Sequence, residues 1–361
     1  MKKTLIALAA LAATGAFAQS SVTLYGAVDA SFEHNSGNGL SVNKMNNSNL
    51  GSSKLGFKGT EDLGGGLKAV FKLEGGLKNE SGNGKSSNTT NQASGTNTAT
   101  ANGSQGLDFQ RYSYVGLAGN FGELHLGREY IWSFWYGEGT VDPFSTNGPA
   151  QATNMFYHLG GAAYVATNAS NMITYISPDA PVQGGFQYFM GQNVANSTVT
   201  VGHSDGTGYS AFLKYQQGPL LISGALSNTT YQVKGNYKVT GLSAQYDISS
   251  AFSLMYTYAK EQQSAYGSNT ENMIAGQFTT GATTWKASYI HASQSGLTAA
   301  STGTGNQYGL GVHYALSKRT KLYTTVAEVK NSGNGGYSTG SVGASSGSSS
   351  GNVAVGVYHS F

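Results

Sequence analysis

The residue types needed for nucleophilic catalysis occur side by side once, at His203-Ser204-Asp205. In a hydrolase triad the nucleophile, base and carboxylate meet in space from separate elements, whereas these three adjoin in a polar stretch between Gly202 and Gly206. Gly84-Lys85-Ser86 resembles the end of a phosphate-binding loop, but position 79 is Asn where that motif requires Gly. We therefore expect no enzyme.

Metal and cofactor chemistry has equally little support. The chain has no cysteine, and its seven histidines show no recognisable metal-ligand spacing. We expect no disulfide framework, no metal site and no cofactor. The formal net charge of +3 also gives no electrostatic case for nucleic acid binding.

The composition points instead to a membrane barrel. Charged residues make up 10% of the chain, against about 25% in ordinary soluble domains, while Gly (52) and Tyr (23) are abundant. Mean hydropathy is −0.26, and beyond the N-terminus no apolar stretch approaches the roughly 18 residues of a helical span. Few charges, many aromatics and no helical span fit a β-barrel with lipid outside and water inside.

The N-terminus has the features of an export signal. Lys2 and Lys3 precede an apolar run from Leu5 to Ala13, and Ala16-Phe17-Ala18 is the small-x-small pattern that signal peptidase cleaves. We expect residues 1–18 to be a removed signal peptide and residues 19–361 to form one barrel domain. A transmembrane anchor is disfavoured because the apolar run is well short of roughly 20 residues.

Alternation with a period of two dominates the remaining chain. Leu55 and Phe57 fall on one parity, and Lys54 and Lys58 on the other. Because successive strand side chains point to opposite faces, each such segment has one apolar and one wet face. The same split recurs along the chain, as at Trp285, Ala287 and Tyr289.

The connections between these segments alternate between short and long. Seven short turns and eight longer loops join about 16 strands, the arrangement of single-chain outer-membrane barrels. The predicted fold is therefore all-β: a transmembrane antiparallel barrel with short periplasmic turns and long external loops. The third loop, 131–170, is unusually long and begins with the aromatic tract Trp132 to Phe144, so we expect it to fold into the lumen.

Several motifs resemble the Gram-negative general porins, most closely the neisserial-type porins of betaproteobacteria. They are Ser21 to Gly26, Lys54 to Gly64, Tyr114 to Leu117, Tyr314 to Thr320 and Val357 to Phe361. The resemblance implies a homotrimer of 16-stranded barrels whose inward third loop forms a constriction. It also implies contact with outer-membrane lipid and lipopolysaccharide, and with periplasmic chaperones and the barrel assembly machinery during biogenesis.

A constriction of this kind works electrostatically, with basic side chains on the wall facing acidic ones on the loop. The resemblance places Lys54, Arg111 and Arg128 on the basic wall, and parity adds Lys58. Glu138 and Asp142 are the only acids in the aromatic tract of the third loop and are the candidates for the negative side. The excess of inward basic residues predicts a mild preference for anions.

Two further expectations concern the chain terminus and the solute. Phe361, on the outward parity with Val357, resembles the terminal aromatic signal that the assembly machinery reads. The expected function is non-specific passive diffusion of ions and small hydrophilic solutes across the bacterial outer membrane. A substrate-specific channel for a sugar or an anion is the alternative, disfavoured because the tyrosines fall mostly on the outward parity rather than lining the lumen.

Overall fold

The computed structural model describes residues 21–85, 106–156, 159, 167–191, 205–231, 234–296, 302–340, 342 and 346–361. The expected signal peptide, residues 1–18, lies outside these ranges. In the described residues, eighteen strands form one antiparallel sheet. Its strands are β1 (Ser21–Gly37), β2 (Leu40–Asn47), β3 (Lys54–Gly64), β4 (Leu67–Lys78), β5 (Asn83–Gly84), β6 (Tyr112–Gly119), β7 (Gly122–Tyr130), β8 (Asn168–Ile176), β9 (Val182–Phe189), β10 (Thr207–Gln217), β11 (Leu220–Thr230), β12 (Tyr237–Asp247), β13 (Phe252–Gln263), β14 (Gly267–Thr280), β15 (Thr283–Ser295), β16 (Gly303–Ala315), β17 (Thr320–Gly333) and β18 (Ser350–Ser360).

Sixteen of these strands close a barrel. The half of β1 near the long loops pairs with β2, the other half pairs with β3, and the opposite edge of β1 pairs with β18. Strand β2 therefore shares one side of β1 with β3, and β5 is a two-residue pairing on β4. Without these two accessory strands, the eighteen become the sixteen that the alternation predicted, and closure leaves none of the sixteen described strands at an open edge of the sheet.

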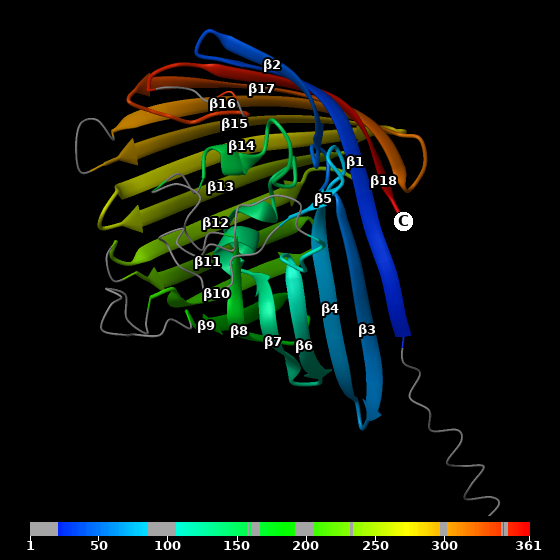
Figure 1. Ribbon diagram of the computed structural model, residues 1–361. Helices are drawn as coiled ribbons and strands as arrows, with labels where there is room; N and C mark the ends of the chain where they lie inside the picture. Colours follow the sequence, from blue (N-terminus) through cyan, green and yellow to red (C-terminus); the bar gives the residue numbers. More distant parts are fainter. Residues whose placement is uncertain are drawn as a thin grey trace, which may run out of the picture.

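The strands present two different faces. On β13, Leu254 and Tyr256 are exposed on the outside, whereas Thr257 and Ala259 are buried on the inside. Seven connections of two to five residues lie at one end of the barrel; the other end carries the longer loops and the short turns 38–39 and 264–266 (Figure 1). No helix among the described residues is long and apolar enough to cross a membrane.

The loop after β7 enters the barrel. It contains the short helix α2 (Trp132–Phe134), the π-helical turn η1 (Trp135–Gly139) and the 3-10 turn η2 (Ala152–Asn154). Figure 1 shows these green segments inside the ring of strands. The expected inward-folded third loop is therefore confirmed.

Candidate constriction of the lumen

Serine side chains on the inner wall hold the first half of the third loop. Ser133 Oγ donates to Ser227 Oγ at 2.8 Å, Ser223 Oγ donates to the carbonyl of Tyr136 at 2.8 Å, and Ser243 Oγ donates to the carbonyl of Gly137 at 2.6 Å. These wall serines lie on β11 and β12, where the inward residues next to the loop, Ser223, Ala225, Ser227, Gly241 and Ser243, are small. Small inward residues give the loop backbone room to approach the wall and polar atoms to bond there.

Aromatic rings complete this anchor. Trp132 packs edge-to-face on Phe212 with ring centroids 4.5 Å apart, and Tyr136 stacks on Phe212 at 3.8 Å. Trp132 also covers Gly185, where an added Cβ would lie 2.3 Å from its Cη2. Trp132 and Tyr136 thus pack against β9 and β10, whereas Trp135 of the same tract is 41% exposed.

Asp142 organises the turn in the middle of the loop. Its Oδ1 accepts the amide hydrogen of Phe144 at 2.9 Å, and its Oδ2 accepts those of Thr146 at 2.9 Å and Ala152 at 3.0 Å. Asp142 is only 5% exposed. Burial raises the pKa of its carboxyl above the ordinary value, and the amide donors oppose that shift. The structure therefore places Asp142 inside the loop, where it fixes the loop conformation, rather than at its open surface.

The second half of the loop reaches the far wall. Gln307 Nε2 donates to the carbonyls of Ala150 and Gln151, both at 3.1 Å, and Lys286 Nζ donates to the carbonyl of Pro143 at 2.5 Å. Phe144 fills the space over Gly311, whose Cβ would lie 2.7 Å from the ring. The loop therefore crosses the lumen from β9–β12 to β14–β16 and leaves the opening beside the remaining strands.

The remaining opening is a cavity of about 850 Å³ with a strongly basic lining. Glu33 is the only carboxylate among its described lining residues. The cations of the lining are Lys44, Lys54, Lys85, Arg111, Lys286 and Lys321. Of these six, only Lys54 and Arg111 were predicted from the sequence. Lys286 could have been found by parity, since it alternates with the outward Trp285 and Ala287.

Two predicted wall residues, Lys54 and Arg111, meet at a buried carboxylate. Arg111 Nε lies 2.5 Å from Glu74 Oε1, while Lys54 Nζ and Lys72 Nζ lie 3.7 and 3.9 Å from Glu74 Oε2. Glu74 is 2% exposed and also accepts the hydroxyl of Tyr25 at 2.8 Å. One carboxylate cannot neutralise three cations, so this cluster is net positive.

Lys85 adds a further positive charge next to Arg111. Its backbone amide donates to the carbonyl of Gly76 at 3.1 Å, and its side-chain stem passes over that glycine, whose Cβ would lie 3.0 Å from Lys85 Cδ. Its ammonium makes no ion pair within the described ranges. Burial, with Arg111 nearby, lowers the pKa of Lys85 below its ordinary value.

The other predicted constriction residues lie elsewhere. Lys58 is exposed, with Nζ 5.7 Å from the ring centroid of Tyr25, and does not line the cavity. Arg128 does not line it either: Nε donates to the carbonyl of Gln110 at 2.6 Å and Nη1 to Ser170 Oγ at 2.7 Å. The pairing register shifts between Gly127 and Glu129. The side chain of Glu138 lies outside the described part of the structure.

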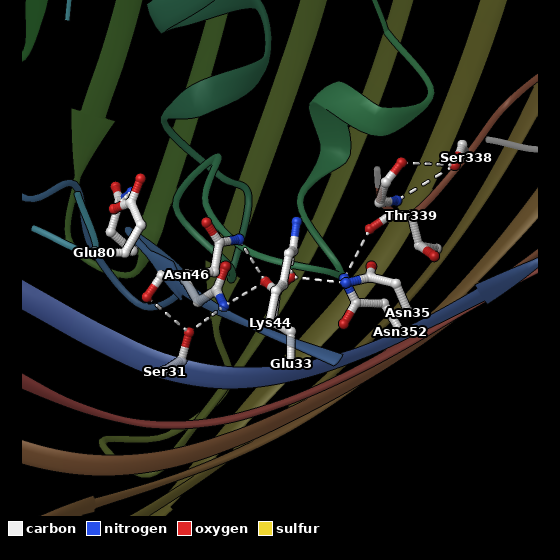
Figure 2. A network of polar contacts seen from close by, with 12 residues as sticks. Ser31, Glu33, Asn35, Lys44, Asn46, Glu80, Ser338, Thr339 and Asn352 are labelled. Carbon is white, nitrogen blue, oxygen red and sulfur yellow. Dashed lines mark hydrogen bonds and ion pairs between the residues drawn. The ribbon is translucent and has the colours of Figure 1, made fainter. Parts of the chain in front are cut away.

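Glu33 is itself held in a polar network on the inner side of β1 (Figure 2). Lys44 Nζ lies 3.3 Å from Glu33 Oε2, and the amides of Asn35 and Asn46 donate to its carboxylate at 2.9 and 2.7 Å. Beside it, Asn352 Nδ2 donates to the carbonyl of Thr339 at 3.1 Å. The acidic charge of the lining is thus partly offset by Lys44.

Some tyrosines lie on the inner face of the barrel. Tyr25 donates to Glu74, Tyr323 donates to Asp29, and Tyr114 stacks on His125 with centroids 4.1 Å apart. Most tyrosines of the described strands nevertheless face outward, as expected; those that are exposed are Tyr175, Tyr188, Tyr209, Tyr215, Tyr246, Tyr256, Tyr289, Tyr308 and Tyr314. Since wall carboxylates hold the hydroxyls of Tyr25 and Tyr323, these two rings are engaged with the wall.

Phe361 lies on the outer surface at the seam between β1 and β18 and is 45% exposed. Its amide donates to the carbonyl of Gly26, and its carbonyl accepts the amide hydrogen of Gly26, each at 3.1 Å. The final residue therefore extends the pairing of the two strands. Elsewhere, His203 and Ser204 lie outside the described residues, among which no group of three His, Cys, Asp or Glu side chains could hold a metal ion.

Comparison with known proteins finds relatives along the chain. Residues 4–334 match the family described as Gram-negative porin. The chain is 32% identical to outer membrane porin protein 32 of Delftia acidovorans over all of both chains. It is 29% identical to major outer membrane protein P.IB of Neisseria meningitidis serogroup B, covering 89% of this chain and 91% of that protein. A solved anion-selective porin from Comamonas acidovorans is similar in structure, with a TM-score of 0.78, 28% identity, and coverage of 95% of this chain and 100% of that chain.

Proposed function

Since this chain belongs to the Gram-negative porin family and is therefore an outer-membrane diffusion channel, we propose that it conducts small anions in preference to cations. The resemblance to neisserial-type porins is confirmed by the relatives from Neisseria and Delftia. The observation that supports the preference is the cavity lining, with six cationic side chains and one described carboxylate.

The basic lining acts on every ion that enters. Lys54, Arg111 and Lys85 lie on one flank of the opening, and Lys286 and Lys321 extend the positive surface from β15 and β17. A narrow opening lined by one sign of charge raises the local concentration of the opposite ion. We assign the basic wall to these residues. Lys58 then contributes a more distant charge, and Arg128 acts by holding the Gln110 backbone.

The acidic side of the constriction stays a proposal that rests on loop position. Glu138 and Asp142 are the loop carboxylates. The bonds of Asp142 to three backbone amides support a role in holding the loop. A substrate-specific channel for a sugar or one anion is not favoured, because the relatives named above are porins and one is described as anion-selective.

Reversal potentials across a planar bilayer in a potassium chloride gradient test the proposal. The wild-type channel should show chloride preference, and Lys286→Gln combined with Lys321→Gln should move the permeability ratio toward unity. The matched control is Lys318→Gln combined with Arg319→Gln, which removes two charges at a short turn outside the cavity lining. Cation preference in the wild type, or an equal shift in the control, would overturn the assignment.

We further propose that the chain assembles as a homotrimer after export with cleavage of residues 1–18. Chaperones and the barrel assembly machinery would handle the unfolded chain, and the finished barrel would contact outer-membrane lipid and lipopolysaccharide. The family resemblance supports these proposals. Cross-linking of the purified protein should stop at three copies, and N-terminal sequencing should begin at Gln19.

A further inference from the structure

The three tryptophans of the chain lie in different surroundings. Trp132 is buried between the third loop and the wall, and Trp285 is exposed on the outer face of the barrel. Trp135 is also exposed, but it lines the cavity inside the barrel. It is therefore the one tryptophan that presents its indole to solutes in the pore.

The backbone of the third loop fixes the position of Trp135. Its amide donates to the carbonyl of Ile131 at 3.2 Å, and its carbonyl accepts the amide hydrogen and the hydroxyl of Thr140 at 2.8 and 2.7 Å. Phe134 packs beside it with ring centroids 6.4 Å apart. A ring held in this way loses little conformational freedom when a second ring stacks on it, so less of the binding energy is lost to ordering.

Tyr130 connects this indole to a cation of the basic wall. Its ring centroid lies 5.8 Å from that of Trp135 and 5.3 Å from Arg111 Cζ. All three side chains line the same cavity. We name them the Arg111–Tyr130–Trp135 site. An aromatic surface and a guanidinium are thus neighbours of one tyrosine ring in the lumen.

The polar atoms of this site remain available to a solute. Arg111 uses Nε to bind Glu74 at 2.5 Å, whereas its two Nη groups make no hydrogen bond within the part of the chain that the structure describes. The hydroxyl of Tyr130 and the indole N–H of Trp135 make none with those residues either. The two Nη groups of an arginine match the spacing of the two oxygens of a carboxylate.

The combination fits one class of solute better than others. An aliphatic carboxylate would pair with Arg111 but leave the indole without a stacking partner. A neutral sugar would stack on Trp135 but leave the guanidinium without an anion. A planar aromatic carboxylate satisfies both groups, and the cavity of about 850 Å³ is large enough to admit it.

We propose that the Arg111–Tyr130–Trp135 site binds small aromatic carboxylates during their passage through the pore. The carboxylate pairs with the Nη groups of Arg111, the hydroxyl of Tyr130 donates to it, and the ring stacks on Trp135. Release stays fast because the site offers a single exposed ring and opens into the lumen, and other small anions still pass. This inference names a substrate class for the anion-conducting pore proposed above and rests on that proposal.

Block of the chloride current by benzoate tests the inference, with the purified full-length channel in a planar bilayer. Cyclohexanecarboxylate carries the same charge on a six-membered ring that is not aromatic, and benzyl alcohol carries the aromatic ring without the charge. Benzoate should half-block the current at a concentration about five-fold lower than cyclohexanecarboxylate, the effect of one aromatic stacking contact. Benzyl alcohol should block least, because it cannot pair with Arg111.

Three variants locate the binding site. Trp135→Leu keeps an apolar side chain but removes the indole, so the half-blocking concentration of benzoate should rise about five-fold, to that of cyclohexanecarboxylate. Trp135→Phe should keep part of the preference for benzoate, because it restores a ring. Trp285→Leu is the matched control on the outer face and should be blocked as the wild type is.

Equal block of the wild type by benzoate and cyclohexanecarboxylate would overturn the inference, and this comparison holds even if Trp135→Leu fails to assemble. Unchanged benzoate block in assembled Trp135→Leu, or an equal loss in Trp285→Leu, would also overturn it. Reversal potentials in the same membranes separate the two proposals. A chloride-preferring wild type that does not distinguish the two carboxylates overturns this inference alone, whereas a cation preference overturns the proposal on which it rests.

Discussion

Trp132 lies directly over Gly185, so that the first ring of the inward loop occupies the space of a missing side chain on β9. Any side chain at position 185 would begin 2.3 Å from Trp132 Cη2. The loop can therefore pack against the wall only because position 185 has no side chain. Ser223 and Ser243 also let the loop backbone lie close to the wall, because their side chains are small and donate to loop carbonyls.

Gly185→Val should displace Trp132 and loosen the loop from the wall. Because the loop blocks part of the lumen, we expect larger and noisier single-channel conductance with the barrel intact. Gly224→Val is the control, since its Cβ would have no neighbour nearer than 3.7 Å. Wild-type conductance in a folded Gly185→Val protein would mean that the packing of Trp132 on Gly185 does not hold the loop.

Asp142→Ala should destabilise the turn from Asp142 to Ala152. Three backbone amides lose a charged acceptor, and each such bond contributes about 1.5–3 kcal/mol. Limited proteolysis should then cleave the loop in the assembled channel, where the wild type resists. Asp62→Ala, at a short turn, controls for loss of an acidic residue, and equal resistance of Asp142→Ala and wild type would contradict the role of Asp142.

The anion preference should weaken at alkaline pH partly through Lys85. A lysine loses its charge as pH rises through its pKa, and burial beside Arg111 lowers the pKa of Lys85 below its ordinary value of 10.5. In Lys85→Arg the charge persists, because arginine stays protonated. Reversal potentials measured as pH rises should fall less in Lys85→Arg than in wild type, whereas Lys318→Arg should follow the wild type. Identical profiles for Lys85→Arg and wild type would exclude a contribution from Lys85.

Deleting Phe361 should lower the amount of assembled barrel without changing the conductance of the channels that do assemble. The deletion removes two backbone bonds at the seam and the ring that lies over Gly26, whose Cβ would be 2.5 Å from Phe361 Cζ. Gly26→Val should reduce assembly for the same reason. Gly276→Val, at an outward position with its nearest atom at 3.6 Å, is the control. Both effects can be measured by gel mobility before and after heating, and unchanged assembly of the deletion would reject a role for Phe361.

The strands and their faces could be predicted because period-two alternation is a local property. It placed Lys54 inside opposite Leu55, and it located the seven short turns. The longer loop expected at 262–269 is instead a three-residue turn, 264–266. The accessory strand β2 was not predicted, because residues 40–47 pair only with the end of β1 beyond β3. Parity says which face a residue occupies but not which neighbouring strand covers it.

The site was less predictable, because it depends on loop conformation and on exceptions to the alternation. The register of the β7–β8 pair shifts between Gly127 and Glu129, and Arg128, which lies at this shift, does not line the cavity. Asp142 is buried because the loop turns back so that the amide of Ala152, ten residues later, donates to its carboxylate. No short sequence pattern predicts such a turn. Lys85 reaches Arg111 from a separate loop, so only the folded structure brings their charges together.

The pairing of β1 with β18 joins the first described strand to the last. A chain that lacks its C-terminal strand would leave β1 and β17 each with an open edge, and such edges recruit other chains into aggregates. Ring closure therefore requires both β1 and β18. Loss of either strand would therefore open the same seam, although the two lie at opposite ends of the described sequence.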